Sequence, residues 1–433
     1  MELRFSNQDL KKLIIPLVIE QVLAISVGVA DTVMVSHVGE AAVSGVSLVD
    51  MINVLCIQLF AALGTGGAVV CAQFIGQKRK EPACQSADQL ILISAVISVM
   101  AMAVCLAFGE PIIRLAFGKI DAFALSSGMA AITLLMEIFQ PGDHFVVEAD
   151  LYGGSIRLFD NVSKKNNYEF TYLDCSRDDI ESAIRENTKA IYIETPTNPM
   201  MHVSDIAAIA EIARKHQILL IVDNTFLSPY FQNPLKLGAD VVIHSGTKFL
   251  GGHNDTLAGF LVTNNEEIQE KLRFLIKTTG AGLAPFDSWL LLRGIKTLGI
   301  RMERSQENAI KIANWLKAQR VVKQVYYPGL PEHPGYTVMK KQASGFGSML
   351  TFDVDTKAHA LQILERVRMI KFAESLGGVE TLITYPTTQT HADVPEDVRL
   401  KNGITHCTLR LSVGIEDIED LLAELSDVFQ SLE

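Results

Sequence analysis

A long stretch without any charged side chain is the feature that most limits what this chain can fold into. Met51 to Gln77 contains no Asp, Glu, Lys or Arg. At about 1.5 Å rise per residue, a helix of that length exceeds the roughly 30 Å hydrocarbon core of a bilayer and must tilt or bend. Gly64, Gly66 and Gly67 in its middle permit a bend or close packing. We therefore predict a membrane span.

Two further apolar segments predict two more spans. Residues 89–109 are also uncharged and have the length of one span, and residues 13–35 form another if Glu20 and Asp31 face a bundle interior. The alternatives are buried core helices of a soluble domain, which are usually shorter, and a signal peptide, which three consecutive spans argue against. We expect three transmembrane helices, near 13–35, 51–77 and 89–109.

Basic residues predict the orientation of these spans. Lys11 and Lys12 precede the first span and residues 78–80 (Lys-Arg-Lys) follow the second, whereas the loop 37–42 has no Lys or Arg. The N-terminus should therefore be cytoplasmic. Glu20 and Asp31 are either functional carboxylates, for cation or proton coupling, or helix-end residues at the headgroups.

Two short motifs lie in the first predicted span and just after it. The pattern Pro-Leu-Val-Ile-Glu-Gln at 16–21, followed by Val-Ala-Asp-Thr-Val-Met-Val-Ser-His-Val-Gly at 29–39, resembles the opening helices of the multidrug and toxic compound extrusion (MATE) exporters, which are cation-coupled. The resemblance covers residues 6–118. Full carriers of that family are several times longer, with two pseudo-symmetric bundles, so this segment resembles the first part of one.

Beyond residue 120 the chain reads as a soluble enzyme. The first 120 residues hold 8 basic and 9 acidic side chains, so most of the net charge of −11 falls in the remainder. This acidic balance argues against a nucleic-acid partner. The six cysteines form no C-x-x-C pair and the ten histidines show no ligand spacing, so we predict no disulfide framework and no metal site.

Short apolar runs alternate with amphipathic helices after residue 120, as a mostly parallel sheet between helix layers requires. A helix with Met302, Ala309, Ala313 and Leu316 on one face then leads into a smaller mixed domain. We predict strands at 144–148, 169–173, 190–194, 219–223, 240–244 and 258–262, and in the smaller domain near 324–327, 348–354 and 408–413.

Polar side chains fall at the ends of these strands. Asp223 ends one strand, and Ser245, Thr247 and Lys248 follow the next. A lysine that forms a Schiff base with pyridoxal phosphate needs phosphate donors nearby and an anion that keeps the pyridine nitrogen protonated. A helix that opens after residues 126–127 offers unpaired amides for a phosphate. Each feature alone is usually a turn, a helix cap or a surface ion pair. Their order along the chain, taken together, favours a pyridoxal-phosphate site.

The whole set resembles the cystathionine γ-synthase, γ-lyase and β-lyase group of pyridoxal-phosphate enzymes, from about residue 122 to the C-terminus. The matching runs are SSGMAA (126–131), YGG (152–154), ETPTNP (194–199), VDNTF (222–226), HSGTKFLGGH (244–253), ESLGG (374–378) and RLSVGIED (410–417). The resemblance implies fold type I: an α/β large domain over 119–300, with a mostly parallel sheet, and a small C-terminal α+β domain over 301–433.

The resemblance also implies roles for individual residues. The catalytic residues would be Lys248, as the Schiff-base lysine, and Tyr152, as the ring stacked on the cofactor. Asp223 would meet the pyridine nitrogen, the phosphate donors would be Gly128, Met129, Ser245 and Thr247, and the substrate carboxylate would be held by Asn198, Ser375 and Arg410. Glu374 can meet a distal ammonium, which favours cystathionine or an activated homoserine as substrate; a solvated carboxylate is the alternative.

One departure from that family bears on assembly. Its members carry, before the SSGMAA run, an arm with a Tyr-x-Arg pair that binds the cofactor phosphate of a neighbouring subunit, within a homotetramer. No Tyr-x-Arg occurs before Ser126 here. We therefore expect weakened cofactor binding and impaired tetramer formation.

Three functions remain open at this level. The first is a trans-sulfuration enzyme, cytoplasmic in its parent form, joined to part of an exporter and so attached to a membrane. The second is a MATE-like transport protein with a soluble appendage, and the third is a chimeric reading frame without activity. Three spans with a cytoplasmic N-terminus would place the enzyme outside, away from its substrates, which argues against cooperation between the two parts.

Overall fold

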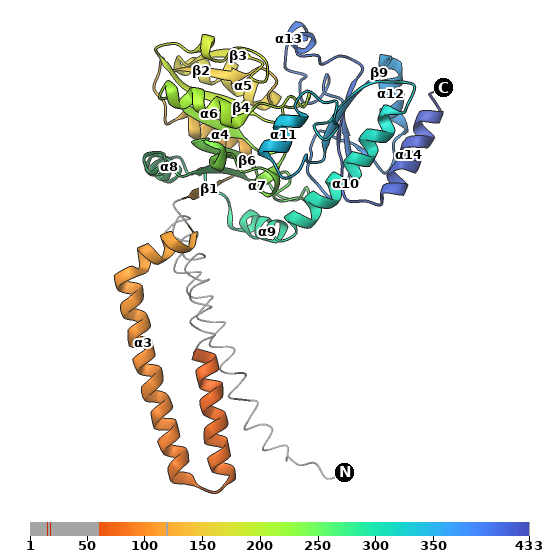
Figure 1. Cartoon of the computed structure of the whole chain (residues 1–433). Coiled ribbons are helices and arrows are strands. Elements are labelled where there is room, and N and C mark those ends of the chain that lie inside the picture. The colour runs from red at the N-terminus through yellow and green to blue at the C-terminus, as the bar shows by residue number, and fades with distance from the viewer. Residues whose placement is uncertain (1–14, 16–17, 19–59, 118–119, 433) are drawn as a thin grey trace. The chain divides into compact units, whose positions relative to one another are not determined.

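The computed structural model describes residues 60–117 and 120–432, together with Ile15 and Val18. The chain divides into two compact units, Met1–Lys119 and Ile120–Glu433 (Figure 1). The predicted span 13–35, including Glu20 and Asp31, lies outside the described residues apart from Ile15 and Val18. The first part of the predicted span 51–77 also lies outside them.

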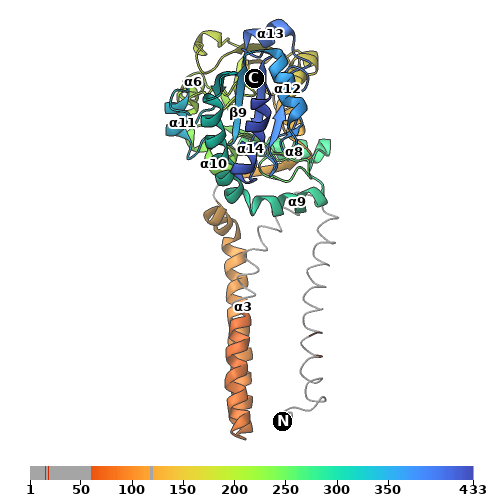
Figure 2. The same ribbon diagram turned by 90° about the vertical axis from the view of Figure 1, so that its right-hand side faces the viewer.

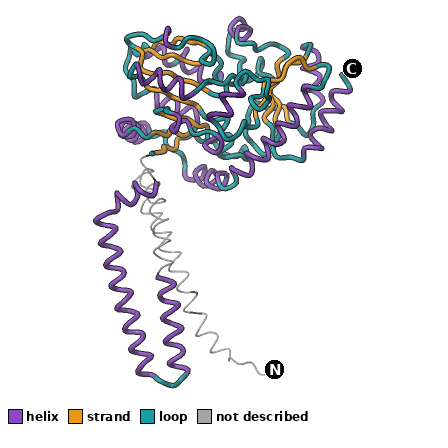
Figure 3. Tube along the Cα trace, in the orientation of Figure 1, coloured by secondary structure: helices purple, strands orange, loops and turns teal. Residues whose placement is uncertain are grey.

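Two antiparallel helices make up the described part of the first unit (Figure 3). An apolar helix over Phe60–Gly76 leads through a turn, in which Lys78 has a φ of 61°, to α3 (Lys80–Phe117). A Cβ atom on Gly67 would overlap Leu90, so the glycine lets the helices approach closely.

Helix α3 is longer than the predicted span 89–109 at both ends. Charged side chains do not stop a helix, so the uncharged run marked only its middle. Among the described residues, one helix, Lys80–Ala103, is long and apolar enough to cross a membrane, judged by length and composition. Its side chains Ile91, Leu92, Val99 and Met102 are all exposed.

The second unit begins with a large domain of alternating strands and helices. Its strands are β1 (Asp121–Leu125), β2 (His144–Glu148), β3 (Glu169–Leu173), β4 (Thr188–Glu194), β5 (Leu219–Asp223), β6 (Val241–Ser245) and β7 (Gly259–Thr263). Its helices are α4 (Gly128–Met136), α5 (Gly153–Asn161), α6 (Ile206–Lys215), α7 (Ser228–Phe231), α8 (Glu266–Thr279) and α9 (Pro285–Ile295), with 3₁₀ turns η1 (Ser163–Asn166), η2 (Glu181–Ala183) and η3 (Pro234–Leu237).

These strands form one sheet in the order β1-β7-β6-β5-β4-β2-β3. The five strands from β6 to β3 are parallel, and β7 pairs antiparallel with both β6 and β1. The sheet is buried on both faces: in β4, Ala190 and Tyr192 enter one apolar core, and Ile191 and Ile193 enter the other. The mostly parallel α/β sheet that we predicted is therefore present.

The small domain has a five-stranded sheet in the order β10-β11-β12-β9-β8. Its elements are α10 (Leu298–Lys317), β8 (Val322–Tyr326), α11 (Tyr336–Gln342), β9 (Met349–Val354), α12 (Lys357–Arg366), β10 (Lys371–Phe372), β11 (Leu382–Thr384), α13 (Glu396–Lys401), β12 (Thr408–Ser412) and α14 (Ile418–Gln430). Figure 2 shows α10, α12 and α14 gathered over strand β9.

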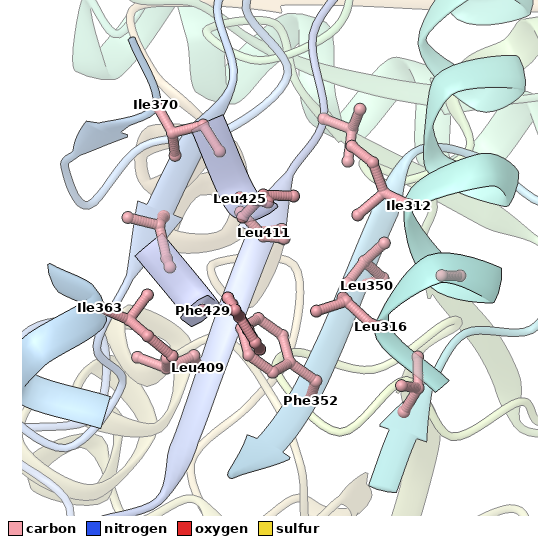
Figure 4. Close-up of a cluster of buried hydrophobic side chains, with 14 of the residues drawn as sticks. Ile312, Leu316, Leu350, Phe352, Ile363, Ile370, Leu409, Leu411, Leu425 and Phe429 are labelled. Atoms are coloured by element: carbon pink, nitrogen blue, oxygen red, sulfur yellow. The ribbon is translucent and has the colours of Figure 1, made fainter. Parts of the chain in front are cut away.

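Side chains alternate between the two faces of the neighbouring strands β9 and β12. One face packs into the core of the small domain, and the other faces away from it. Leu350 and Phe352 on β9, and Leu409 and Leu411 on β12, point into a core with the helices (Figure 4). Because successive side chains of a strand point to opposite faces, Arg410 faces away from that core.

The observed strands agree with the predicted ones to within about two residues at each end, apart from three that the sequence did not indicate. Strand β1 was missed, as were the very short β10 and β11. Strand β1 forms at the sheet edge by pairing with β7, which lies far along the chain.

Candidate active site

Neighbouring parallel strands bring their carboxyl ends to one edge of the large sheet. In the sheet register Glu194 of β4 lies opposite Asp223 of β5, and Ser245 of β6 lies opposite Gly259 of β7. Helix α4 starts at this same edge, because a Cβ on Gly259 would overlap the carbonyl oxygen of Ser127. The strand ends therefore form a floor under the start of α4.

Asp223 is buried and linked to Ser245 through Thr225. The Thr225 backbone N–H and hydroxyl donate to Asp223 Oδ1 at 3.0 and 2.6 Å, and Thr225 Oγ1 accepts from Ser245 N at 2.8 Å. Burial raises the pKa of Asp223 to about 6, against the two Thr225 bonds, which lower it. The carboxylate is thus held in one orientation and is ionised at neutral pH.

A close approach of backbone and side chain forms the candidate phosphate site. A Cβ on Gly128 would lie 3.0 Å from Ser245 Cβ, so glycine here allows the start of α4 to approach β6 closely. Ser127 Oγ caps α4 by accepting from Ala130 N at 3.0 Å. The first amides of the helix, those of Gly128 and Met129, have no partner within the helix by geometry. They suit an anion.

Thr247 differs from the expected picture of a hydroxyl directed at a phosphate. Its Oγ1 accepts from Ala258 N at 3.1 Å and contacts Ala258 O at 3.3 Å. The side chain also lines an open cleft of about 600 Å³, bordered by Ser126, Asn254, Leu283 and Ser375 among others. Thr247 therefore joins the strand end to the wall of this cleft.

Lys248 lies one turn beyond Ser245 and points to the small domain. Its backbone N–H donates to Ser245 O at 3.2 Å, and its Nζ donates to Ser375 Oγ at 3.0 Å. Burial and, to a smaller extent, the Arg410 cation lower the pKa of Lys248 to about 8, against the opposing effect of Glu374. A substantial fraction of this amine is neutral near physiological pH.

Arg410 is buried between the two domains of the second unit. Its Nη1 donates to Asn198 Oδ1 at 2.8 Å, and Nη2 donates to the carbonyls of Glu374 at 2.9 Å and Ser375 at 3.2 Å and to Thr384 Oγ1 at 3.0 Å. The buried Nε has no partner among the described residues. A planar carboxylate could accept from that N–H and from the rest of the guanidinium edge.

Tyr152 begins the next helix, α5, and lies near the same charges. Its backbone N–H donates to Glu194 Oε2 at 2.9 Å, and a Cβ on Gly154 would contact its ring. Burial raises the pKa of Tyr152, and the negative charge of Glu374 raises it further. The ring is therefore neutral and suited to stacking.

The structure brings most of the predicted site residues together. Lys248 and Ser375 are in direct contact, as are Arg410 and Asn198, and Asp223, Ser245 and Gly128 follow in a chain of contacts through Thr225. The Glu374 side chain is exposed, yet its charge acts on Lys248, Tyr152 and Arg410. Met129 is half-buried against the core of the large domain.

Sequence reasoning missed several residues that hold these groups. Thr225 and Glu194 belong to motifs that were noted, but a hydroxyl or carboxylate beside a functional residue gives no signal of its role. Thr384 was missed because it lies on the unpredicted strand β11. Among residues 60–117 and 120–432, no group of three His, Cys, Asp or Glu side chains is placed to hold a metal ion.

Comparison with known proteins gives the relatives of this fold and site. The chain is 50% identical over 311 residues, covering 72% of this chain and 82% of the relative, to the cystathionine γ-lyase of Bacillus subtilis. It is 49% identical over 312 residues (72% and 80%) to the cystathionine γ-synthase of Haemophilus influenzae. It is 46% identical over 314 residues (72% and 83%) to a cystathionine β-lyase of Lactococcus lactis.

Solved structures agree with this relationship. The crystal structure of cystathionine γ-lyase from Lactobacillus plantarum complexed with L-serine matches with a TM-score of 0.70 at 46% identity, over 72% of this chain and 82% of that one. Cystathionine γ-synthase from Xanthomonas oryzae in complex with cystathionine matches with a TM-score of 0.70 at 41% identity, over 71% and 81%. The predicted fold type I architecture is confirmed.

Two family profiles match different parts of the chain. The MatE profile matches residues 16–146, which confirms the resemblance of the N-terminal part to that family. The profile described as Cys/Met metabolism PLP-dependent enzyme matches residues 107–430, three quarters of the chain. With the strand-end site described above, this match establishes that the chain belongs to the Cys/Met metabolism family of pyridoxal-phosphate-dependent enzymes.

Proposed function

We propose that the second unit catalyses an elimination or a replacement at Cβ or Cγ of a sulfur amino acid, with cystathionine or an activated homoserine as substrate. One observation carries the proposal. The Lys248 amine lies 3.0 Å from Ser375 Oγ, and the Ser375 carbonyl in turn accepts from Arg410. A base for the substrate Cα proton and a cation for the substrate carboxylate are therefore fixed to the same short segment.

The residues present fit pyridoxal phosphate. The buried Asp223 carboxylate suits a pyridine nitrogen, the Gly128–Ser245 approach forms a cradle that a Cβ would fill, and the buried Arg410 Nε is left without a partner among the described residues. When bound, the cofactor supplies an electron sink for negative charge at the substrate Cα. Asp223 would hold its nitrogen, Tyr152 would stack on it, and the donors at Gly128, Met129 and Ser245 would hold its phosphate.

Lys248 would hold the cofactor through its amine and, once that amine is free, would accept the proton from the substrate Cα. A lysine with a pKa of about 8 is neutral often enough at pH 7 to accept a proton from Cα and to return it at Cβ or Cγ. Ser375 Oγ holds the amine toward the reaction centre. The protonation cycle therefore relies on the burial that makes this amine a moderate base.

Arg410 and Asn198 would hold the substrate carboxylate. Asn198 Oδ1 already accepts from Arg410 Nη1, which fixes the guanidinium plane and leaves the Nε edge for a bidentate contact. The Glu374 carboxylate is exposed and would meet the distal ammonium of cystathionine. Relatives with three different activities have similar identities, so identity supports the reaction class and leaves the choice among these reactions open.

Lys248→Ala tests the assignment of the Schiff-base lysine. The purified chain should show the visible absorbance of bound cofactor and turn over cystathionine, and Lys248→Ala should lose both because it removes the amine held at Ser375 Oγ in the site. Lys189→Ala, which removes an exposed lysine of β4, is the matched control and should retain both. Persistence of the visible band in Lys248→Ala would refute the assignment.

We also propose that the N-terminal unit attaches the enzyme to a membrane. The MatE match and the exposed apolar side chains of the helix Lys80–Ala103 support this proposal. The alternative, in which the N-terminal part transports a solute, predicts cation-dependent efflux from proteoliposomes. Extraction of membranes at alkaline pH decides the attachment: an integral protein stays in the pellet, whereas release into the supernatant would contradict it.

A further inference from the structure

Three buried carboxylates that the proposed chemistry does not use lie near the carboxyl ends of β2 and β4. Glu148 ends β2, Asp150 follows two residues later, and Glu194 ends β4. Their exposed fractions are 0, 2 and 4%. Carboxylates are rarely buried unless their charge is used, so each one needs a partner that explains its position.

Two of the three hold the loop that carries Tyr152. Glu148 Oε1 accepts from Asp150 N at 3.1 Å, and its Oε2 accepts from Cys175 N at 3.0 Å. Glu194 Oε2 accepts from Tyr152 N at 2.9 Å. Glu148 thus holds the backbone of Asp150 and Glu194 holds the backbone of Tyr152, so two carboxylates fix the loop between β2 and α5.

Asp150 makes contacts of a different kind, because it reaches from this loop to another one. Its Oδ2 accepts from Thr197 Oγ1 at 2.5 Å and from Met200 N at 3.0 Å. Thr197 Oγ1 also accepts from His202 N at 2.9 Å, so the hydroxyl closes a small turn. One carboxylate oxygen thus joins the loop after β2 to the loop after β4.

The second loop contains the residue that orients Arg410. Asn198 lies between Thr197 and Met200, the two residues that donate to Asp150, and its Oδ1 accepts from Arg410 Nη1 at 2.8 Å. Asn198 is itself buried. Holding the residues on both sides of Asn198 fixes where its amide oxygen meets the guanidinium.

We propose that Asp150 is a positioning residue that sets Asn198 against Arg410, and thereby sets the geometry in which the substrate carboxylate is bound. The inference rests on the proposed function, because it assigns the carboxylate to Arg410 and Asn198. Thr197 and Met200 donate to the same oxygen, Oδ2, whose two lone pairs can accept both hydrogen bonds. Asp150 Oδ1 has no hydrogen-bond partner among the described residues, so one oxygen carries the whole link.

Ligand binding to three variants of the full chain in detergent tests this role. Asp150→Ala removes both oxygens and Thr197→Val removes the donating hydroxyl, whereas Asp150→Asn is the conservative variant, because its amide oxygen can still accept both donors. The matched control is Asp240→Ala, because Asp240 Oδ2 also accepts a backbone N–H, that of Leu220, at 2.8 Å, but it does so at the opposite ends of the strands.

The probes are L-serine and L-serinamide, which differ only at the α-carboxyl group, with binding measured by calorimetry on cofactor-loaded protein. We expect Asp150→Ala and Thr197→Val to bind L-serine about tenfold more weakly, as loss of a buried hydrogen bond implies, and L-serinamide within about twofold of wild type. Asp150→Asn should bind L-serine more tightly than Asp150→Ala does, and Asp240→Ala should bind both ligands as wild type does. Equal weakening of both ligands, or L-serine binding unchanged by Asp150→Ala, would overturn the inference.

Hydrogen exchange gives a second measurement that needs no ligand. Asp150→Ala should speed amide exchange in residues 197–202 about tenfold while leaving 190–193 in β4 unchanged. Unchanged exchange in 197–202 would also overturn the inference. If wild type shows no cofactor absorbance that depends on Lys248, the proposed function fails instead, and the exchange result still decides whether Asp150 fixes this loop.

Discussion

Replacing Lys248 by Met should stabilise the cofactor-free protein at neutral pH, because the folded state holds this amine in an unfavourable place. Burial and the nearby Arg410 lower the pKa of Lys248 from 10.5 to about 8. In the unfolded chain the amine keeps a pKa near 10.4. Protonation of the amine therefore costs folding free energy at any pH below the pKa of the amine in the unfolded chain.

The size of this effect follows from the two pKa values. Each pKa unit corresponds to about 1.4 kcal/mol, so the protonated amine destabilises the fold by about 3 kcal/mol at pH 7. Lys248→Met also removes the bond to Ser375, a loss of about 1 kcal/mol. The variant should therefore be more stable than wild type by about 2 kcal/mol at pH 7.

The stability difference between Lys248→Met and wild type should change sign with pH. The cost is fully present below pH 8, declines as the pH rises from the folded to the unfolded pKa, and vanishes above about 10.4, where the amine is neutral in both states. Above that pH only the lost Ser375 bond remains. Lys248→Met should then be less stable than wild type by about 1 kcal/mol.

Urea unfolding of the apo-protein in detergent, at pH 7 and pH 10.5, measures both values. Both tryptophans, Trp289 and Trp315, lie in the second unit, so their fluorescence reports on that unit. Lys189→Met is the control and should change stability little at either pH, because Lys189 is exposed. Destabilisation by Lys248→Met of equal size at both pH values would refute the reasoning.

Three further outcomes are expected. Gly259→Ala should lower stability by about 1–3 kcal/mol and weaken cofactor binding, because its Cβ would overlap the Ser127 carbonyl; urea unfolding with wild-type stability would contradict this. Glu374→Gln should slow turnover of cystathionine, but not that of an activated homoserine without a distal ammonium. Equal rates of wild type and Glu374→Gln on cystathionine would contradict the proposed contact between Glu374 and the distal ammonium. Titration of the apo-protein should give cofactor binding at least about tenfold weaker than in a family member that carries the Tyr-x-Arg arm, because that arm would add two charge-assisted phosphate contacts. Tight binding in a well-formed tetramer would show that the Tyr-x-Arg arm is dispensable.

The sequence by itself determined the main strands of the large sheet and the ends at which the site residues lie. Strands such as β5 (Leu219–Asp223) are short apolar runs buried on both faces, and a run of that kind ends where a polar residue such as Asp223 appears. The face of Arg410 also follows from the sequence, since it alternates with Leu409 and Leu411.

Only the tertiary structure decided the short pairings and the supporting contacts. Strand β1 forms because β7 offers an edge to pair with, and β10 and β11 are too short to show a period of their own. Asp150 meets Thr197 and Met200 because β2 and β4 are neighbours in the sheet, which residue types and spacing along the chain do not reveal.

The electrostatic state of the site was likewise beyond the sequence. The residues Lys248, Glu374 and Arg410 lie far apart along the chain, and the pKa of Lys248 depends on how they pack. The pKa of a group depends on how deeply the group is buried and on its distance to each charge. Both are fixed by the packing of the small domain against the large domain. The chain specifies which groups are present, whereas packing specifies how basic the lysine is.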